Sequence, residues 1–160
     1  MSRKGPAKIR KIEQDAVYNN FLVSKLITAI MKDGKKNVAT RQVYAALDLL
    51  KKKYPKEDPS TVLEQGIEAI KPKIEVRPRR IGGSVYQVPT PVKSNRQISL
   101  AIRWLITAAR AKANKQFHTF GEKIADEIIA SLKNEGSAIS KKQEVERMAE
   151  ANKAFAHLRW

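Results

Sequence analysis

Three guanidinium groups crowd four positions of this chain, at Arg77, Arg79 and Arg80. They lie in residues 71–118, where eleven lysine or arginine side chains and one acid, Glu75, give +10 of the formal net charge of +16. The planar fork of donors on arginine matches phosphate oxygens. Because unbalanced charge repels itself in a compact state, the sequence predicts a polyanionic partner, in the first place a nucleic acid. A strand edge kept soluble by charge is the plainer alternative.

A second group of arginines recurs at intervals of seven, at Arg96, Arg103 and Arg110. On an α-helix this spacing keeps the side chains on one face, with a drift of about 20° per step, and places them about 10 Å apart along the axis. No acid occurs between residues 94 and 111. We interpret the row as a surface for a phosphate backbone; an ordinary solvated helix face is the alternative.

Two further groups of cations are candidates for the same role. Residues 1–11 hold five cations and no acid, which indicates either a basic arm that orders on RNA or DNA or a solvated tail. Lys141 and Lys142 follow Ser140 in a capping-box pattern, and are expected in the first turn of the last helix, at the positive end of its dipole. That place is unfavourable for stability alone but suits a bound phosphate.

Enzyme chemistry has little support in the sequence. The two histidines, His118 and His157, stand in unrelated contexts, and there is no cysteine. Residues 33–36 lack the upstream glycine and the hydroxyl of a P-loop. We therefore predict no catalytic residues, no metal site and no cofactor. No apolar run approaches the roughly 20 residues of a membrane span, and the N-terminus has no secretory signal.

Apolar residues at helical spacing dominate the rest of the chain. They predict six helices. The first begins at an Asn19 or Asn20 cap and stops at Asp33-Gly34, the second ends before Pro55, and the third begins at Asp58-Pro59 and stops at Pro72. Capping boxes at Ser94–Gln97, Thr119–Glu122 and Ser140–Gln143 open the fourth, fifth and sixth. Two β-prone runs between Ile74 and Val88, on either side of Gly82-Gly83, predict a hairpin. Tyr86 on this hairpin either stacks on a base or packs at the hairpin base.

These elements predict a mainly α fold. The expected architecture is a bundle of about six helices with one protruding basic β-hairpin at about residues 73–89. Residues 1–12 are expected to form a basic N-terminal arm, and residues 13–160 a single helical domain. A chain of 160 residues with an apolar fraction of 42% is large enough for one domain with a substantial core.

Four segments resemble a known family. They are Asp33-Gly-Lys-Lys36, Glu75-Val-Arg-Pro-Arg-Arg-Ile-Gly-Gly-Ser-Val-Tyr-Gln-Val-Pro89, Ala101-Ile-Arg-Trp104 and Arg147-Met-Ala-Glu-Ala-Asn-Lys-Ala-Phe-Ala-His-Leu-Arg-Trp160. In order and content they are similar to the bacterial-type family of the seventh small-subunit ribosomal protein, from about residue 15 to residue 160. The second and fourth segments are highly specific for that family.

The resemblance implies a structural, non-enzymatic protein that binds the 3′ major domain of small-subunit rRNA and nucleates assembly of the head. It also implies a place at the exit-tRNA site near the mRNA path, beside the eleventh small-subunit protein and other head and platform proteins, in a bacterial cytoplasm or a plastid stroma. With Arg110 added from the helical row, the rRNA-binding candidates are Arg3, Lys4, Lys8, Arg10, Lys35, Lys36, Arg77, Arg79, Arg96, Arg103 and Arg110. The tRNA-proximal candidates are Arg80, Gly82, Gly83, Lys141, Lys142 and Arg147.

The chain departs from the family pattern at two places. Val145-Glu146 stands where the family usually has a Thr-His pair, so the polar contact of that pair is not expected here. Residues 112–120 form a longer segment, which we interpret as a loop insertion, because closing a longer loop costs little.

Two other classes of function are alternatives to this one. An architectural DNA-binding protein, with its hairpin in a minor groove, accounts for the charge and the hairpin but not for the four segments. An enzyme acting on RNA requires a catalytic constellation that the sequence lacks.

Overall fold

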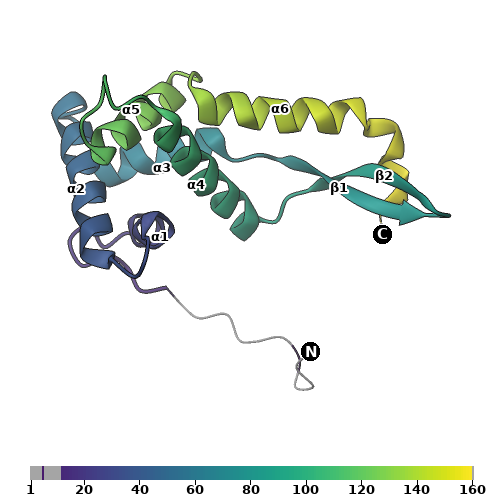
Figure 1. The fold of residues 1–160 in the computed structure, drawn as a ribbon, viewed down its shortest axis with the longest axis horizontal. Coiled ribbons are helices and arrows are strands. Elements are labelled where there is room, and N and C mark those ends of the chain that lie inside the picture. Colours follow the sequence, from purple (N-terminus) through teal and green to yellow (C-terminus); the bar gives the residue numbers. More distant parts are fainter. Residues whose placement is uncertain (1–4, 6–11, 160) are drawn as a thin grey trace.

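A computed structural model of the protein describes Gly5 and residues 12–159. Figure 1 shows a helical body with a long hairpin and a long helix reaching away from it. The elements of the described part are α1 (Phe21–Ile30), α2 (Lys36–Lys53), α3 (Pro59–Ile70), β1 (Ile74–Ile81), β2 (Ser84–Pro91), α4 (Ser94–Ala111), α5 (Phe120–Leu132), α6 (Ser137–Ala151) and the 3-10 helix η1 (Lys153–Leu158). The predicted mainly α fold with a protruding β-hairpin is confirmed.

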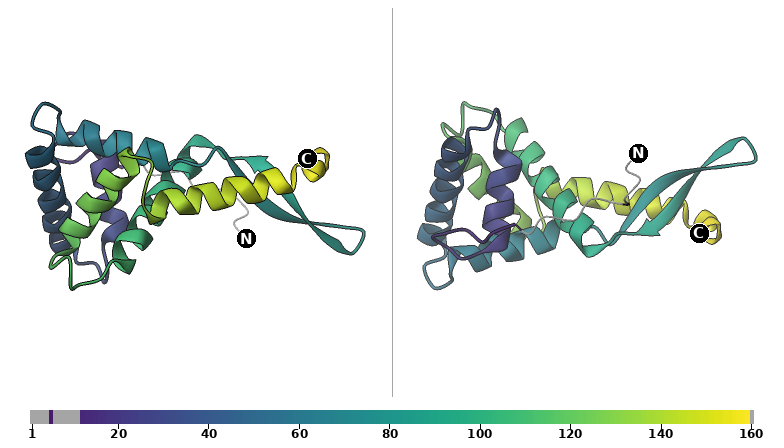
Figure 2. Two further views of the ribbon diagram at one scale, coloured as in Figure 1. Left: turned by 90° about the horizontal axis from the view of Figure 1, so that it is seen from above. Right: turned by 90° about the horizontal axis from the view of Figure 1, so that it is seen from below.

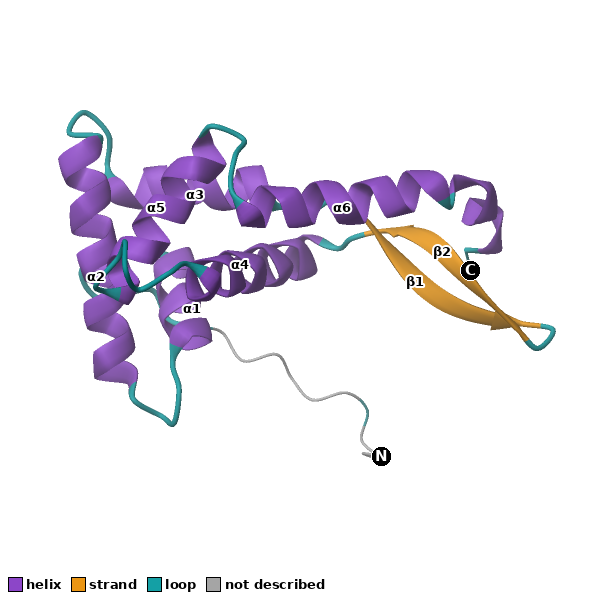
Figure 3. Ribbon diagram, turned by 45° about the horizontal axis from the view of Figure 1, so that its top comes forward, coloured by secondary structure: helices purple, strands orange, loops and turns teal. Residues whose placement is uncertain are grey.

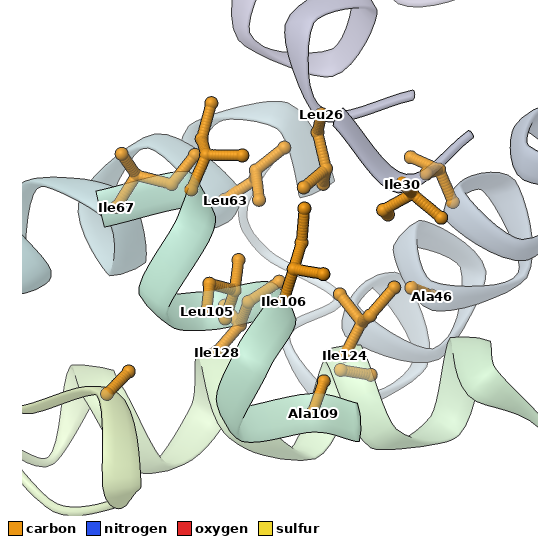
Figure 4. Close-up of a cluster of buried hydrophobic side chains, with 14 of the residues drawn as sticks. Leu26, Ile30, Ala46, Leu63, Ile67, Leu105, Ile106, Ala109, Ile124 and Ile128 are labelled. Carbon is orange, nitrogen blue, oxygen red and sulfur yellow. The ribbon is translucent and has the colours of Figure 1, made fainter. Parts of the chain in front are cut away.

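Helix α5 lies at the centre of the helical body and packs against α2, α3 and α4. Its apolar stripe, with Ile124 and Ile128 essentially inaccessible to solvent, lies in one hydrophobic cluster with Leu63 of α3 and Leu105 of α4 (Figure 4). Helices α5 and α2 approach so closely that only glycine fits at position 121, because a Cβ on Gly121 would lie 2.8 Å from the Gln42 carbonyl oxygen. This apolar core fixes the directions in which α4 and α6 leave the body.

The hairpin pairs β1 and β2 in continuous antiparallel register from Ile74 opposite Pro91 to Ile81 opposite Ser84. It lies alongside α6, as the two turned views of Figure 2 and the colouring of Figure 3 show. Tyr86 packs against Phe155 of η1 with ring centroids 5.4 Å apart, so packing is the role that the structure gives this tyrosine. An isolated hairpin is marginal in water, and here α6 and η1 support it.

Local capping signals placed two helix starts correctly. Asn20 caps α1, with its side-chain oxygen accepting from the Leu22 backbone N–H at 2.7 Å. Thr119 and Glu122 form the predicted capping box of α5. Pro59 is the first residue of α3, although the carboxylate of Asp58 accepts from the Ser60 hydroxyl at 2.6 Å and makes no capping bond.

The other two capping boxes were wrong. Helix α4 already includes Ser94, and Lys93 is the cap residue, so the Ser94 hydroxyl makes no capping bond. Helix α6 begins at Ser137, a full turn earlier than predicted, and the Ser140 hydroxyl donates back to the Gly136 carbonyl at 3.1 Å. Within residues 12–159, no helix has both the length and the apolar character needed to cross a membrane.

Candidate nucleic-acid interface

The hairpin presents arginines on both of its faces. Side chains alternate along a strand, so Arg77 and Arg79 share the face of Glu75, whereas Arg80 points to the opposite face. Arg77 and Arg80 are exposed, and Arg79 is half-buried. This arrangement offers guanidinium groups on two opposite faces of the hairpin.

The tip of the hairpin is a two-residue turn with backbone open to solvent. Gly82 and Gly83 both have positive φ, 56° and 88°, as a tight hairpin turn requires. Apart from the glycine itself and its two chain neighbours, no heavy atom of the described residues lies within 4 Å of where a Cβ would stand on either residue. Side chains therefore do not shield the tip, and a partner can approach its backbone closely.

Glu75 joins the hairpin to α4. Its carboxylate is buried and accepts from Arg77 Nε at 2.6 Å and from Arg96 Nε at 2.8 and 2.9 Å. Arg96 lies in the first turn of α4, directly after the hairpin. The single acid of the most basic stretch is thus the shared partner of two of its arginines.

The environment of Glu75 favours its charged form. Burial raises the pKa of this carboxyl, but the hydrogen bonds and charges of Arg96 and Arg77 outweigh burial and hold the pKa below its ordinary value of 4.5. A carboxylate with a lowered pKa stabilises the fold above its unfolded-state pKa, and that stabilisation is lost as the pH falls through the folded-state value.

We therefore expect Glu75→Gln to flatten the acid dependence of stability. The wild type should have a larger free energy of unfolding than this variant. The difference should be constant above about pH 5 and should decrease as the pH falls below 4.5. Urea denaturation of both proteins between pH 3 and pH 7 measures this difference. A difference that does not change with pH contradicts the ion pairs described here.

The arginine row of α4 faces α1 over part of its length. Arg103 and Arg110 line a groove of about 300 Å³ with Lys25 of α1. We call this the α1–α4 groove; it is lined by Lys25, Ala29, Ser99, Ile102, Arg103, Ile106, Thr107 and Arg110. The structure thus brings two members of the predicted row together, and Arg96 lies apart from them at Glu75.

Arg110 also belongs to a neighbouring groove of about 390 Å³ at the start of α2. Lys32 and Lys35, from the segment between α1 and α2, line it too, and the adjacent Lys36 is exposed. Among the residues that the structure describes, no acid lines either of these two grooves. Together they form a cationic surface suited to a phosphate backbone.

The start of α6 corrects the prediction for Lys141 and Lys142. Because α6 begins at Ser137, both lysines lie beyond its first turn and not beside its free N–H groups. Lys141 Nζ pairs with Glu144 at 2.8 Å, and Lys142 Nζ donates to the Ala69 carbonyl at 2.8 Å, near the end of α3. The predicted phosphate site at a helix start is therefore wrong for these two residues.

Five of the predicted binding residues remain, one on the surface of α6 and four outside the described residues. Arg147 is exposed on α6. Arg3, Lys4, Lys8 and Arg10 lie outside the described residues. Among residues 12–159, no three His, Asp or Glu side chains come together as metal ligands.

Sequence reasoning missed the cations that tertiary packing brings to these sites. Lys25 gave no signal, because nothing local shows that this side of α1 faces α4. Lys73, Lys153 and Arg159 were also missed. They line a groove of about 600 Å³ between the hairpin base, α6 and η1, which Glu146 and Glu150 line as well. Glu75 was noticed only as an isolated acid, although its isolation among cations was the available sign of an ion-pair partner.

Nearly the whole chain is similar to one family of ribosomal proteins. The family model described as "Ribosomal protein S7p/S5e" matches residues 2–153. The "Small ribosomal subunit protein uS7" of Thermotoga neapolitana is 51% identical over 158 residues, 99% of each chain. Those of Dictyoglomus turgidum and Caldicellulosiruptor bescii are 49% and 50% identical over the full length of both chains. On these grounds the chain belongs to the S7p/S5e family of ribosomal proteins.

Proposed function

We propose that this protein is a structural constituent of the small ribosomal subunit, acting in translation as an rRNA-binding protein and not as an enzyme. The observation that carries the proposal is the cationic surface of the two grooves, together with the hairpin arginines, on a chain that belongs to a ribosomal protein family. Small-subunit relatives with about half of their residues identical support the same assignment.

The proposed mechanism is electrostatic and based on shape. Lysine and arginine side chains neutralise RNA phosphates and release condensed counterions. The closely packed core fixes α4, and α6 and η1 support the hairpin, so the arginines of both elements are held at fixed relative positions. Folded RNA is recognised mostly through its shape and backbone, so a rigid array of cations holds RNA helices in one relative orientation.

The finer assignment is a place in the head of the subunit. The α1–α4 groove and the Arg77 face of the hairpin bind the 3′ major domain of the rRNA and nucleate head assembly. The opposite face of the hairpin meets the exit-site tRNA near the mRNA path, beside the eleventh small-subunit protein. The tRNA-proximal residues are Arg80, Gly82 and Gly83 of the hairpin and Lys141, Lys142 and Arg147 of α6. The compartment is the bacterial cytoplasm.

Chemical footprinting tests this placement. The protein is added to full-length small-subunit rRNA, and backbone protection is compared with that of a variant in which Arg103 and Arg110 are both replaced by Gln. Protection confined to the 3′ major domain, and reduced there in the variant, supports the proposal. Protection scattered over all rRNA domains contradicts it.

We expect removal of residues 1–11 to weaken rRNA binding and to lower its salt dependence. The segment carries five cations, and each phosphate contact contributes about 0.7–0.9 to the slope of log K against log salt. Titrations at several salt concentrations give the slope, which should fall by about 2 to 4 if most of these cations contact phosphates. Thermal melting is the control: a large loss of melting temperature shows that the segment belongs to the core.

A further inference from the structure

We propose that Glu75 is a positioning residue for RNA binding, which holds Arg77 and Arg96 together as one site for RNA phosphate oxygens. The inference rests on the proposed function and deepens it. It assigns a role in RNA binding to an acidic residue. An account based on net charge alone expects an acidic residue to weaken binding to a polyanion.

The contacts of the three side chains carry the proposal. Glu75 is 6% exposed, whereas the side chains of Arg77 and Arg96 are 48% and 50% exposed. The carboxylate engages Nε and Nη2 of Arg77 and Nε of Arg96, all within 2.9 Å. A guanidinium has five N–H donors, so these contacts fix each arginine while using only part of its donor set. The two half-exposed groups therefore keep donors for a ligand on the solvent side.

Glu75 links β1 to α4 through its hydrogen bonds. Arg77 and Glu75 come from β1, and Arg96 comes from the first turn of α4. The Val92 N–H donates to the Lys73 carbonyl at 3.1 Å, which closes the base of the hairpin just before α4 begins. The carboxylate thus fixes the direction of the hairpin relative to the helix as well as the two rotamers.

Two like charges near one another repel, and a shared carboxylate offsets that repulsion. Without it, the arginines separate into flexible positions, and ordering them on RNA costs side-chain entropy. With it, the pair is preorganised before the ligand arrives, as planar bidentate recognition of phosphate requires.

The proposal makes a prediction opposite in sign to that of charge counting. Glu75→Gln raises the formal net charge by one, so a purely electrostatic account expects tighter binding to every nucleic acid. Positioning expects weaker binding to the folded rRNA target and no loss on an unstructured polyanion. Glu57→Gln is the matched control, because Glu57 is exposed in the segment between α2 and α3 and its replacement adds the same charge.

The experiment compares the full-length wild type, Glu75→Gln and Glu57→Gln on an rRNA 3′-domain fragment and on polyuridylate, at one salt concentration. We expect Glu75→Gln to lose about tenfold in affinity for the fragment, the effect typical of a broken coupled pair, and to bind polyuridylate at least as tightly as the control. Equal affinities of the two variants for the fragment overturn the proposal. If the wild type itself does not prefer the fragment, the proposed function fails instead.

A second variant keeps the test valid if Glu75→Gln folds poorly, which thermal melting shows. Arg96→Lys preserves the net charge and leaves a cation beside the carboxylate, but it removes the planar fork. We expect it to weaken binding to the fragment about as much as Glu75→Gln, and the double variant to lose less than the two single losses combined. Fully additive losses, or an Arg96→Lys protein with wild-type affinity, overturn the proposal.

Discussion

Replacement of Arg77, Arg79 and Arg80 by alanine should weaken binding to small-subunit rRNA by about 3 kcal/mol, at about 1 kcal/mol for each charged contact. This corresponds to roughly a hundredfold increase in Kd. All three residues belong to β1, where they alternate between the two faces of the hairpin. The hairpin projects away from the helical body (Figure 1). Filter binding to an rRNA 3′-domain fragment measures the loss.

The matched control removes three cations elsewhere. Lys51, Lys52 and Lys53 are exposed in the last turn of α2, which lies at the far end of the molecule from the hairpin (Figure 1). Their replacement by alanine changes the net charge equally, and we expect it to cost far less affinity. The circular-dichroism spectrum should be unchanged in both proteins, because Glu75 keeps Arg96 as a partner. Equal losses in the two triple variants mean that the hairpin contributes only bulk charge.

Glu127→Ala should lower the free energy of unfolding by about 3 kcal/mol, the low end of the range for breaking a buried ion pair. Glu127 is 1% exposed. Its carboxylate pairs with Lys112 Nζ at 2.8 Å and accepts from the Ala138 backbone N–H at 2.9 Å. It therefore holds the end of α4 and the start of α6 against α5. Denaturant unfolding measures the change.

Asp126 is the control for this prediction, because it contacts the same lysine. Asp126 pairs with Lys112 Nζ at 2.6 Å, but its side chain is 47% exposed. Exposed ion pairs contribute little, so Asp126→Ala should cost less than about 1 kcal/mol. Similar losses in the two variants mean that burial and the bond to Ala138 do not matter.

The sequence predicted those parts of the fold that depend on neighbours in the chain. Asn20 and Thr119 cap helices as expected, because the bonded groups are two or three residues away. Gly82 and Gly83 made the hairpin turn predictable, since a two-residue turn needs positive φ.

The start of α6 was predicted wrongly because a distant residue decides it. Glu127 of α5 supplies the acceptor for the Ala138 N–H, and Gly136 provides the positive φ of 95° just before the helix. This tertiary cap lies one turn before Ser140 and overrides the local capping box. The start of α4 shows a related effect: Lys93 follows the closed base of the hairpin, so Ser94 is already helical.

In the candidate interface, too, local features could be predicted from the sequence, whereas contacts between distant residues could not. Charge density and spacing identified the arginines of the hairpin and of α4. Their partners could not be read from the sequence: Arg96 meets Glu75, 21 positions away, and Lys142 meets the Ala69 carbonyl, 73 positions away. Lys25 joins Arg103 only through the packing of α1 beside α4.

The measurement that tests the central claim most directly is competitive binding to an rRNA 3′-domain fragment at near-physiological salt, with bulk tRNA and duplex DNA as competitors. The account predicts that binding of the fragment survives an excess of either competitor, because a fixed array of cations recognises folded rRNA by its shape. Equal displacement by tRNA and by DNA would contradict it, and would favour an architectural DNA-binding protein that uses the same charge without selection.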